Sequence, residues 1–421
     1  MKKILFYCQN LLGMGHLVRT TELMRELVKT FEVCLIEGGQ KVAGFEMLPE
    51  VEVIQLPTIQ VEVFDSLQVG KQLQVVGSTM SLEEVKEFRQ QKLIEVFDRF
   101  QPDVLITEGY PFSKNKALAF EMVPLLEHVR KSDRTTQAIC SLRDIIMVKE
   151  FADRDAEEKR RCEFVNQYYD AILLHSDPAI HRLEDNISTA GSLTCPVYYT
   201  GYVVQSEPDR VEFDLTDSEL LKDPIPKIVV SVGGGKLGHD LLESIIQAAP
   251  LIHQQIYHQI VIFAGPLMDE AKYRQLEKLA QGKTNVNLRR FTPSLIAYLD
   301  RADLSISLGG YNTTMNILKT GVKSMIYPSD KDREQAIRAE KLERLGLLKI
   351  LDKSELDPEL LARSIVNYLA DDATLNFEHL IQLDGAEKAS IILQNLLEFN
   401  AKSVTPTIEI VASGAKSPYA D

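Results

Sequence analysis

Short apolar runs alternate with longer amphipathic stretches along the first half of the chain. The runs have the length and composition of buried strands, and the stretches space their apolar residues as one face of a helix. The pattern predicts strands at residues 3–8, 33–36, 51–56, 103–107, 137–142, 171–174 and 197–202. The helices that separate them are predicted at residues 16–29, 81–100, 116–131 and 153–169. Strands that alternate with helices indicate a parallel sheet covered by helices on both faces.

The second half of the chain repeats this plan. Its strands are predicted at residues 227–232, 259–264, 286–289, 303–307 and 324–327. Its helices are predicted at residues 240–254, 270–281, 293–301, 311–320, 333–345 and 358–370. Residues 57–79 alternate only weakly and contain two glycines, which favours a long surface loop.

The segment 205–226 differs from both halves because acidic residues and prolines replace most of the apolar ones. We interpret it as a linker between two doubly wound domains, residues 1–204 and 227–384. A helix within residues 385–400 carries an apolar stripe that needs a packing partner, for which the first domain is the candidate. Residues 401–421 are expected to form a flexible tail. Ligands bind such sheets at the carboxyl ends of the strands, so two facing domains would enclose one cleft.

Composition narrows the function classes. The 421 residues are 45% hydrophobic and 26% charged, as in a globular protein, and the formal net charge is −14. That charge argues against nucleic acid or an anionic membrane surface as the main partner. Five scattered cysteines without a CxxC pair suggest neither a zinc site nor a disulfide framework. The first apolar run is too short for a signal peptide and no run has the length of a membrane span, so we expect a cytoplasmic protein without stable membrane insertion, either monomer or homodimer.

The strand at residues 303–307 leads into a diglycine turn and a helix. Gly309 and Gly310 permit a sharp turn, and the helix then begins at Tyr311. The free N–H groups and partial positive charge of a helix start suit an anion such as phosphate. An ordinary strand-to-helix turn would show the same pattern, so this stretch alone does not establish a site.

A triple-glycine loop follows the first strand of the second half. Gly233, Gly234 and Gly235 permit close approach of a ligand to the backbone, and Lys236 can reach a phosphate. The spacing of a Walker loop is absent. The position at the start of a sheet favours a binding loop over a flexible surface turn.

The loop after the first strand of the chain carries Gly13, Gly15 and His16. It begins like a dinucleotide fingerprint, but Arg19 stands where the third small residue belongs, so support for an NAD site is weak. A histidine in the first turn of a helix is biased toward its neutral form, which leaves one ring nitrogen free to accept a proton. A histidine that only packs or caps is the alternative, and the flanking glycines favour a functional role.

Further polar and aromatic residues fall at the same edges of the two predicted sheets. Arg290 and Phe291 follow one strand, and the phenyl ring offers an apolar shelf for a nucleotide base. Glu108 and Asp144 follow two strands of the first domain and are candidates for an acid, a base or an acceptor ligand. Structural salt bridges are an equally good explanation for both carboxylates.

Taken together, these motifs resemble MurG-like glycosyltransferases. GMGH, the loop at residues 231–238, RRFTPSLIAYLDRADLSIS, GGYNT and KDREQ occur in the order seen in that family. TEGYPFSKNKALAFEMVPLLE and SLRDI are similar to a branch known as predicted glycosyltransferases. The resemblance covers most of the chain, is weakest over residues 57–79 and is absent from the tail.

The resemblance implies an α/β protein of the GT-B fold, with two facing doubly wound Rossmann-like domains and a cleft between them. It implies an inverting hexosyltransferase that moves a sugar from a nucleoside-diphosphate sugar, UDP-linked, to an acceptor hydroxyl. The donor would lie mainly in the second domain and the acceptor in the first. No metal or other cofactor is implied, because the nucleotide sugar is itself a substrate.

The resemblance also implies roles for individual residues. The residues that would hold the diphosphate are Gly309, Gly310, Asn312 and Thr313. Phe291 would lie beside the base, Glu334 and Gln335 would contact the donor sugar, and His16 would be the general base or part of the acceptor and phosphate site.

Two positions depart from the family. Asn316 stands where MurG-like enzymes grip the ribose hydroxyls with a Glu, and an amide lacks that charge-assisted, bidentate grip. Near residues 113–115 only Lys114 remains of the basic residues that the branch favours. Two alternatives therefore stay open: a nucleotide-sugar hydrolase or 2-epimerase, which shares the fold and the glycine-loop histidine, and a non-catalytic nucleotide-sugar-binding protein.

Overall fold

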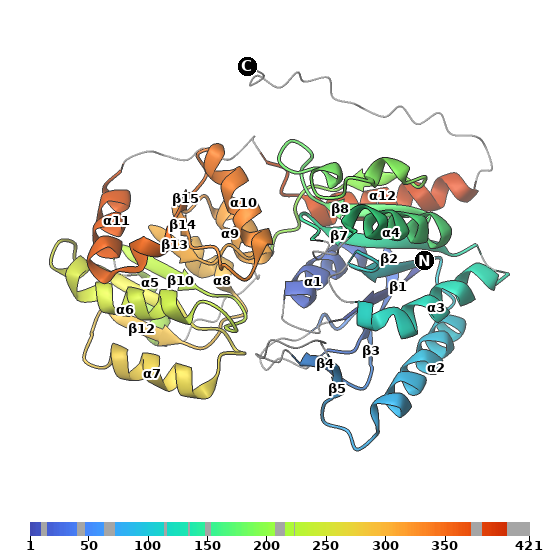
Figure 1. Cartoon of the computed structure of the whole chain (residues 1–421), viewed down its shortest axis with the longest axis horizontal. Coiled ribbons are helices and arrows are strands. Elements are labelled where there is room, and N and C mark those ends of the chain that lie inside the picture. The colour runs from blue at the N-terminus through green and yellow to red at the C-terminus, as the bar shows by residue number, and fades with distance from the viewer. Residues whose placement is uncertain are drawn as a thin grey trace.

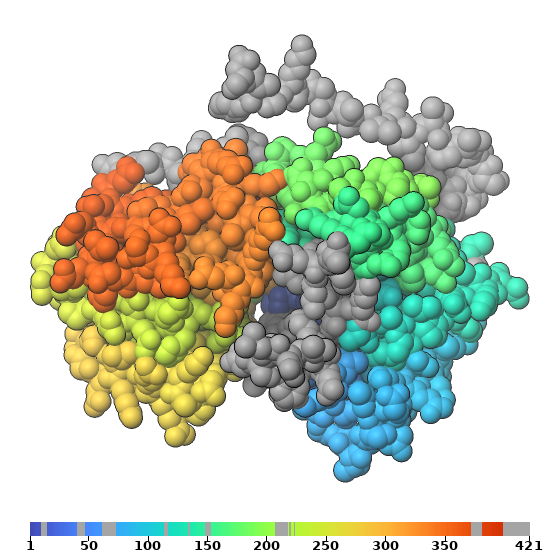
Figure 2. Space-filling view, in the orientation of Figure 1, coloured from blue at the N-terminus to red at the C-terminus, as the bar shows by residue number. Residues whose placement is uncertain are grey.

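Two α/β lobes make up the described part of the protein (Figure 1). The structure is a computed structural model, and it describes residues 1–9, 15–39, 47–62, 72–112, 116–133, 135–147, 153–206, 215–222, 224–371 and 381–401. In the space-filling view the two lobes meet along a seam (Figure 2).

The first lobe is built on a parallel sheet. Within the described ranges seven strands pair in the order β3-β2-β1-β6-β7-β8-β9. The strands are β1 (Lys2–Cys8), β2 (Phe31–Glu37), β3 (Glu52–Gln55), β6 (Val104–Glu108), β7 (Gln137–Arg143), β8 (Ala171–His175) and β9 (Val197–Tyr199). The α-helices between them are α1 (Gly15–Leu27), α2 (Leu82–Phe100), α3 (Ala119–Lys131) and α4 (Arg154–Tyr168). The predicted alternation of strands and helices is thus confirmed in this lobe.

The second lobe has the same plan. Its strands, among the described residues, pair in parallel in the order β12-β11-β10-β13-β14-β15. They are β10 (Lys227–Ser231), β11 (Gln259–Phe263), β12 (Val286–Arg289), β13 (Leu304–Ser307), β14 (Ser324–Ile326) and β15 (Lys349–Ile350). The α-helices are α6 (His239–His253), α7 (Glu270–Ala280), α8 (Leu295–Leu299), α9 (Tyr311–Thr320), α10 (Arg333–Arg344) and α11 (Pro358–Ala370).

Each sheet is buried on both faces, as its continuous apolar strands predict. Leu5 and Tyr7 of β1 belong to the core cluster under α2 and α3, while Ile4 and Phe6 belong to the cluster on the opposite face. Alternate residues of a strand point to opposite faces, so one apolar run supplies both cores.

Helix α12 (Gly385–Ala401) returns to the first lobe (Figure 1). Its residues Ala389, Leu393 and Leu397 are buried in the cluster that contains Ile4 and Phe6. The apolar stripe of this helix therefore completes one face of the N-terminal sheet.

Three segments differ from the sequence prediction. The segment 57–79, expected to be a loop, contains the antiparallel pair β4 (Ile59–Glu62) and β5 (Gln72–Val75). The expected linker contains helix α5 (Leu215–Lys222), whose Leu221 is buried in the core of the second lobe. Strand β15 was not anticipated because it is only two residues long.

The order of the strands indicates where a ligand is expected to bind. In the first sheet β1 lies between β2 and β6, and in the second β10 lies between β11 and β13. Open parallel sheets bind ligands outside the carboxyl ends of their strands where the order reverses in this way. The start of α1 and the carboxyl ends of β6, β10 and β13 lie at these positions, and they carry candidate residues. No helix within the described ranges is long and apolar enough to cross a membrane.

Candidate active site

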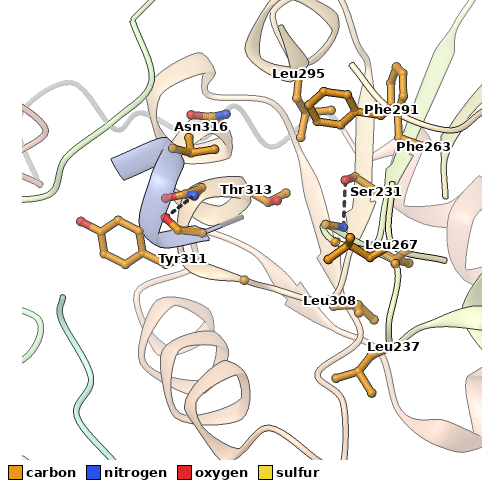
Figure 3. Close-up of a pocket in the computed structure, with 18 of the residues that line it drawn as sticks. Ser231, Leu237, Phe263, Leu267, Phe291, Leu295, Leu308, Tyr311, Thr313 and Asn316 are labelled. Atoms are coloured by element: carbon orange, nitrogen blue, oxygen red, sulfur yellow. Dashed lines mark hydrogen bonds between the residues drawn. The ribbon is translucent and has the colours of Figure 1, made fainter. Parts of the chain in front are cut away.

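A pocket of about 350 Å³ opens between the two lobes (Figure 3). The glycine loop after β10, the loop after β12 and the diglycine turn after β13 form most of its wall. The start of α1 contributes Gly15, and Gln205 comes from the chain that leaves the first lobe. The pocket thus joins elements of both lobes, as expected for ends of strands that face each other.

The glycine loop presents its backbone to the pocket. A Cβ added at Gly233, where φ is +63°, would meet no atom of the described residues within 4 Å apart from its chain neighbours, so this glycine faces the open pocket. The hydroxyl oxygen of Ser231 accepts a hydrogen bond of 3.3 Å from the Gly233 N–H and fixes the turn (Figure 3). At Gly235 a Cβ would instead lie 2.5 Å from the carbonyl oxygen of Ala264, so that glycine permits packing against the next loop.

The two glycines of the diglycine turn have different roles. Gly309 has φ +74°, and a Cβ there would lie 2.7 Å from Cγ2 of Ile326. Gly309 is absent from the pocket wall, whereas Gly310 lines it and is the N-cap of α9. The prediction that Gly309 contacts the donor is therefore not supported: this glycine makes the turn, and Gly310 faces the pocket.

Helix α9 begins at the pocket wall without a side-chain cap. Within the described part of the chain no side chain caps this helix at Gly310, so the first backbone N–H groups remain available to an anion. Asn312 and Thr313, in the first turn, line the pocket. Nδ2 of Asn312 donates a hydrogen bond of 3.1 Å to the carbonyl oxygen of Gly15. The starts of α9 and α1 are thereby held together across the seam.

One end of the pocket is apolar. Phe291, Phe263 and Leu295 gather there (Figure 3). Aromatic and aliphatic walls of this kind suit the flat face of a nucleotide base.

Arg290 and Lys236, two cations of the pocket wall, differ in the contacts that they already make. Arg290 packs over the ring of Tyr273, 4.0 Å from its centroid, and pairs with Glu270. Lys236 is exposed and makes no ion pair within the described ranges. Lys236 is therefore the better placed of the two for a phosphate.

His16 lies in the first turn of α1, beside the pocket rather than in its wall. Its side chain is 34% exposed, and its Nδ1 lies 3.1 Å from Oε1 of Glu108. Burial lowers the pKa of His16, and the hydrogen bond with Glu108 offsets this effect only in part. His16 is therefore neutral at pH 7, and when Nδ1 donates its proton to Glu108, Nε2 is a free acceptor.

Glu108 is buried and fully engaged. Arg19 pairs with its Oε1, and the hydroxyl of Ser141 donates to its Oε2 over 2.8 Å. Burial alone would raise the pKa of Glu108, but the charge of Arg19 and the hydrogen bond from His16 outweigh it and hold the pKa below its usual range. Glu108 is a carboxylate that orients His16, not a group open to the pocket.

Asp144 is likewise buried, and its oxygens are taken. Nε and Nη2 of Arg338 donate to its two oxygens over 2.7 and 2.8 Å. Burial opposes ionisation, but the Arg338 charge prevails and the pKa of Asp144 is lowered. Asp144 is 1% exposed and absent from the pocket wall, so the geometry does not support its predicted role as acid or base. It joins the two lobes instead.

Glu334 and Gln335 line the pocket from the start of α10, as predicted for sugar contacts. Glu334 also pairs with Arg338 of its own helix, over 2.7 Å, and with Arg143 of the first lobe. Gln335 Oε1 accepts a hydrogen bond of 3.0 Å from the N–H of Ser329, which leaves its amide nitrogen as a donor.

Asn316 lines the pocket but is tied to the chain that leaves the first lobe. Its Nδ2 donates to Oε1 of Gln205 over 3.0 Å, and its Oδ1 lies 3.4 Å from the N–H of Gln205. Nε2 of Gln205 in turn donates to the carbonyl oxygen of Pro293 over 2.6 Å. The amide at position 316 therefore bridges the pocket wall and the linker.

Most of the predicted donor residues meet in this one pocket. The predicted residues found in its wall are Gly15, Gly233, Gly234, Gly235, Lys236, Arg290, Phe291, Gly310, Asn312, Thr313, Asn316, Glu334 and Gln335. Gly13, and the segment 113–115 around Lys114, lie outside the described residues.

Sequence reasoning missed Arg19, Arg143 and Gln205. Arg19 carries a usable signal, because it lies one helical turn after His16. As to metals, no group of three or more His, Cys, Asp or Glu side chains with the spacing of a metal site occurs among the described residues.

Comparison with known proteins shows which class of protein the chain resembles. Residues 228–394 match the glycosyltransferase family 28 C-terminal domain. The chain is 22% identical over 417 residues to an uncharacterized glycosyltransferase of Methanosarcina acetivorans, covering 94% of this chain and 98% of that relative. The fold is that of GT-B glycosyltransferases.

Two further similarities narrow the group. The chain is 26% identical over 213 residues to the UDP-N-acetylglucosamine–N-acetylmuramyl-(pentapeptide) pyrophosphoryl-undecaprenol N-acetylglucosamine transferase of Haemophilus influenzae, covering 48% of this chain and 58% of that enzyme. The crystal structure of Acinetobacter baumannii MurG superposes with a TM-score of 0.52 at 13% identity, covering 95% of this chain and 99% of that one. The protein is a glycosyltransferase that is similar to MurG in sequence and in fold.

Proposed function

We propose that the protein transfers a sugar, with inversion, from a UDP-linked donor to an acceptor hydroxyl without a metal ion. The observation that carries the proposal is the bond from Asn312 to the carbonyl oxygen of Gly15, 3.1 Å long. It brings His16, on α1, next to the uncapped start of α9. A neutral base and an anion site then lie side by side, as a displacement reaction with a diphosphate leaving group requires.

The pocket has parts that suit each portion of the donor. The apolar end at Phe291 and Leu295 fits the base, and the glycine loop with Lys236 and the start of α9 fits the diphosphate. Gln335, with a free amide donor, and Glu334 are then positioned for the sugar. The uracil base is proposed by analogy, because the Haemophilus relative is named for UDP-N-acetylglucosamine.

The chemistry is a single displacement. Nε2 of His16 takes the proton of the acceptor hydroxyl, and the oxygen forms a bond to the anomeric carbon from the face opposite the diphosphate. The bond between that carbon and the phosphate oxygen breaks, and the leaving UDP keeps the electron pair. Backbone N–H groups of α9 and the glycine loop, with Lys236, stabilise the added charge. Glu108 stabilises the imidazolium that forms, because its carboxylate already accepts from Nδ1.

His16→Ala tests the proposal. We expect UDP release from UDP-sugars, assayed with a panel of monosaccharide, phenol and lipid-linked saccharide acceptors, to fall about 100-fold or more. The affinity for UDP, measured by calorimetry, should change less than about twofold, because His16 is not part of the pocket wall. His128→Ala is the matched control: that histidine is 33% exposed and also pairs with a carboxylate, Asp98.

Other outcomes separate the alternatives. Normal turnover in His16→Ala would remove His16 from the mechanism. Release of free sugar from the donor alone, lost in His16→Ala, would favour a hydrolase, and UDP binding without turnover on any acceptor or water would indicate a binding protein.

A further inference from the structure

A second histidine lies behind the site, unused by the mechanism above. His175 ends β8 and is fully buried. Its Nε2 lies 3.0 Å from the hydroxyl oxygen of Ser141, and its Nδ1 lies 2.9 Å from that of Thr200. Burial, reinforced by the charge of Arg19, lowers the pKa of His175 to about 3, so this imidazole is neutral.

Counting protons fixes the direction of these bonds. The hydroxyl of Ser141 has one proton. Its oxygen lies 2.8 Å from Oε2 of Glu108 and 3.0 Å from Nε2 of His175. The Glu108 carboxylate can only accept, so Ser141 donates to Glu108. His175 must then donate from Nε2 to Ser141, and its Nδ1 accepts from Thr200. In this arrangement the hydroxyl of Thr200 gives its proton to His175 rather than to the nearby carbonyl oxygen of Gly201.

The other oxygen of Glu108 faces the proposed base. Oε1 accepts from Arg19 and lies 3.1 Å from Nδ1 of His16. Arg19 can only donate, and its Nη2 is 3.3 Å from the same Nδ1. If Glu108 turned away, Nδ1 would lose its acceptor and could accept from Arg19, and the proton would move to Nε2. The orientation of the carboxylate therefore decides which nitrogen of His16 is free.

We propose that Ser141 and His175 are positioning residues for His16. They form a directed chain of hydrogen bonds, Thr200 to His175 to Ser141 to Glu108, that holds the carboxylate in the orientation in which His16 keeps its proton on Nδ1 and offers Nε2. The proposal rests on the proposed function only in taking His16 as the base.

The charged groups around His16 and Glu108 determine how the pKa of His16 changes when this chain of hydrogen bonds is broken. His16 faces Glu108 from β6, Arg19 from its own helix and Arg143 from the end of β7. Glu108 faces Arg19, His16 and His175, and lies near the thiols of Cys8 and Cys140. Without the Ser141 hydroxyl, less of the Glu108 charge is satisfied, so it attracts the His16 proton more strongly and the pKa of His16 rises.

Ser141→Ala in the full chain tests the proposal by ¹⁵N NMR of the histidine rings, which needs neither donor nor acceptor. In the wild type we expect His16 to carry its proton on Nδ1. In Ser141→Ala we expect the pKa of His16 to rise by about half a unit or more, about threefold in the protonation equilibrium. We expect kcat to fall about tenfold at unchanged KM for the donor.

Three variants complete the design. Ser141→Thr keeps the hydroxyl and should restore both the pKa and kcat. His175→Phe removes the donor to Ser141 but keeps a ring of similar shape, and should shift the pKa in the same direction as Ser141→Ala. Ser324→Ala is the matched control, since Ser324 is a buried strand serine of the second lobe whose hydroxyl has no hydrogen-bond partner among the described residues.

The outcomes are distinct. A wild-type His16 protonated on Nε2, or an unchanged His16 pKa in folded Ser141→Ala, would overturn the positioning role. Normal turnover in His16→Ala would instead reject the proposed base and leave the NMR result on the hydrogen-bond chain as it stands.

Discussion

Two buried arginine–carboxylate pairs lie close to the same tyrosine ring. The guanidinium of Arg19 lies 5.1 Å from the ring centroid of Tyr311, and that of Arg338 lies 5.6 Å from it. Arg19 pairs with Glu108 inside the first lobe, whereas Arg338 reaches from the second lobe to Asp144 in the first.

The pairs differ in what else the carboxylate touches. Glu108 divides its oxygens between Arg19 and two neutral groups, Ser141 and His16. Both oxygens of Asp144 accept from Arg338. Glu108 is thus hydrogen-bonded to a side chain that can exchange a proton, whereas both oxygens of Asp144 are occupied by Arg338. One arginine–carboxylate pair thus contacts a histidine, and a second pair of the same type joins the two lobes.

Breaking the joint is expected to have the largest effect. Arg338→Met would leave Asp144 as a buried charge without its partner, at a cost of about 3–5 kcal/mol in the free energy of unfolding. It would also remove the donors to the carbonyl oxygen of Gly309 and to Glu334, so the affinity for UDP should weaken about tenfold. Urea unfolding and calorimetry measure the two effects.

The control is Arg363→Met, on an exposed position of α11, which should stay within about 0.5 kcal/mol of the wild type. A loss below about 1 kcal/mol in Arg338→Met, with UDP affinity intact, would mean that the joint does not hold the lobes.

Glu108→Gln addresses the other pair. The amide can offer an N–H to His16, which would reverse its tautomer, so kcat should fall about 100-fold while the affinity for UDP changes less than about twofold. Asp144→Asn should do the opposite and weaken UDP binding more than it slows turnover, because it loosens Arg338. If Asp144→Asn lowers kcat further than Glu108→Gln does, at unchanged UDP affinity, the two carboxylates have been assigned the wrong way round.

The smallest expected effect is on the pH dependence of stability, in which His175 differs from Glu108 and Asp144. The pKa of Glu108 and that of Asp144 are lowered, so their stabilisation is complete above pH 4.5 and 3.8 and is lost only as the pH falls below these values. The pKa of His175 is lowered from 6.5 to about 3, so its contribution is present above pH 6.5 and declines as the pH falls toward 3.

Between pH 6.5 and 5 His175 should therefore reduce the free energy of unfolding by about 2 kcal/mol, and His175→Phe should abolish that part of the decline. The measurement is urea unfolding at the two pH values. Equal declines in the two proteins would show that His175 does not stay neutral in the folded state.

The sequence supported the fold and most of the pocket because their signals are local. A strand, a glycine turn and a helix start are contiguous in the chain, so Gly233, Gly310 and Asn312 were found. The predicted strands and helices rest on the same short-range periodicity. The brief strand β15 has too few residues to show any period.

The partners of the polar residues are not local. Arg19 and Glu108 are 89 positions apart, Gln205 and Asn316 are 111 apart, and Asp144 and Arg338 are 194 apart. Arg338 lies in a helix so rich in charge that it reads as solvated, yet its side chain is only 3% exposed. Sequence could name the acidic candidates, but only the packed lobes show that Asp144 is committed to an arginine.

Helix α12 has a consequence for exchanging modules between enzymes of this fold. The chain leaves the first lobe near residue 206 and returns to it with α12, whose apolar side chains complete the core around Ile4 and Phe6. A chimaera that grafts a foreign second lobe onto this first lobe therefore needs two splice points, one on each side of the transplanted lobe. A single fusion near residue 226 would leave an apolar groove beside α1 unless the incoming C-terminal helix happened to fit it.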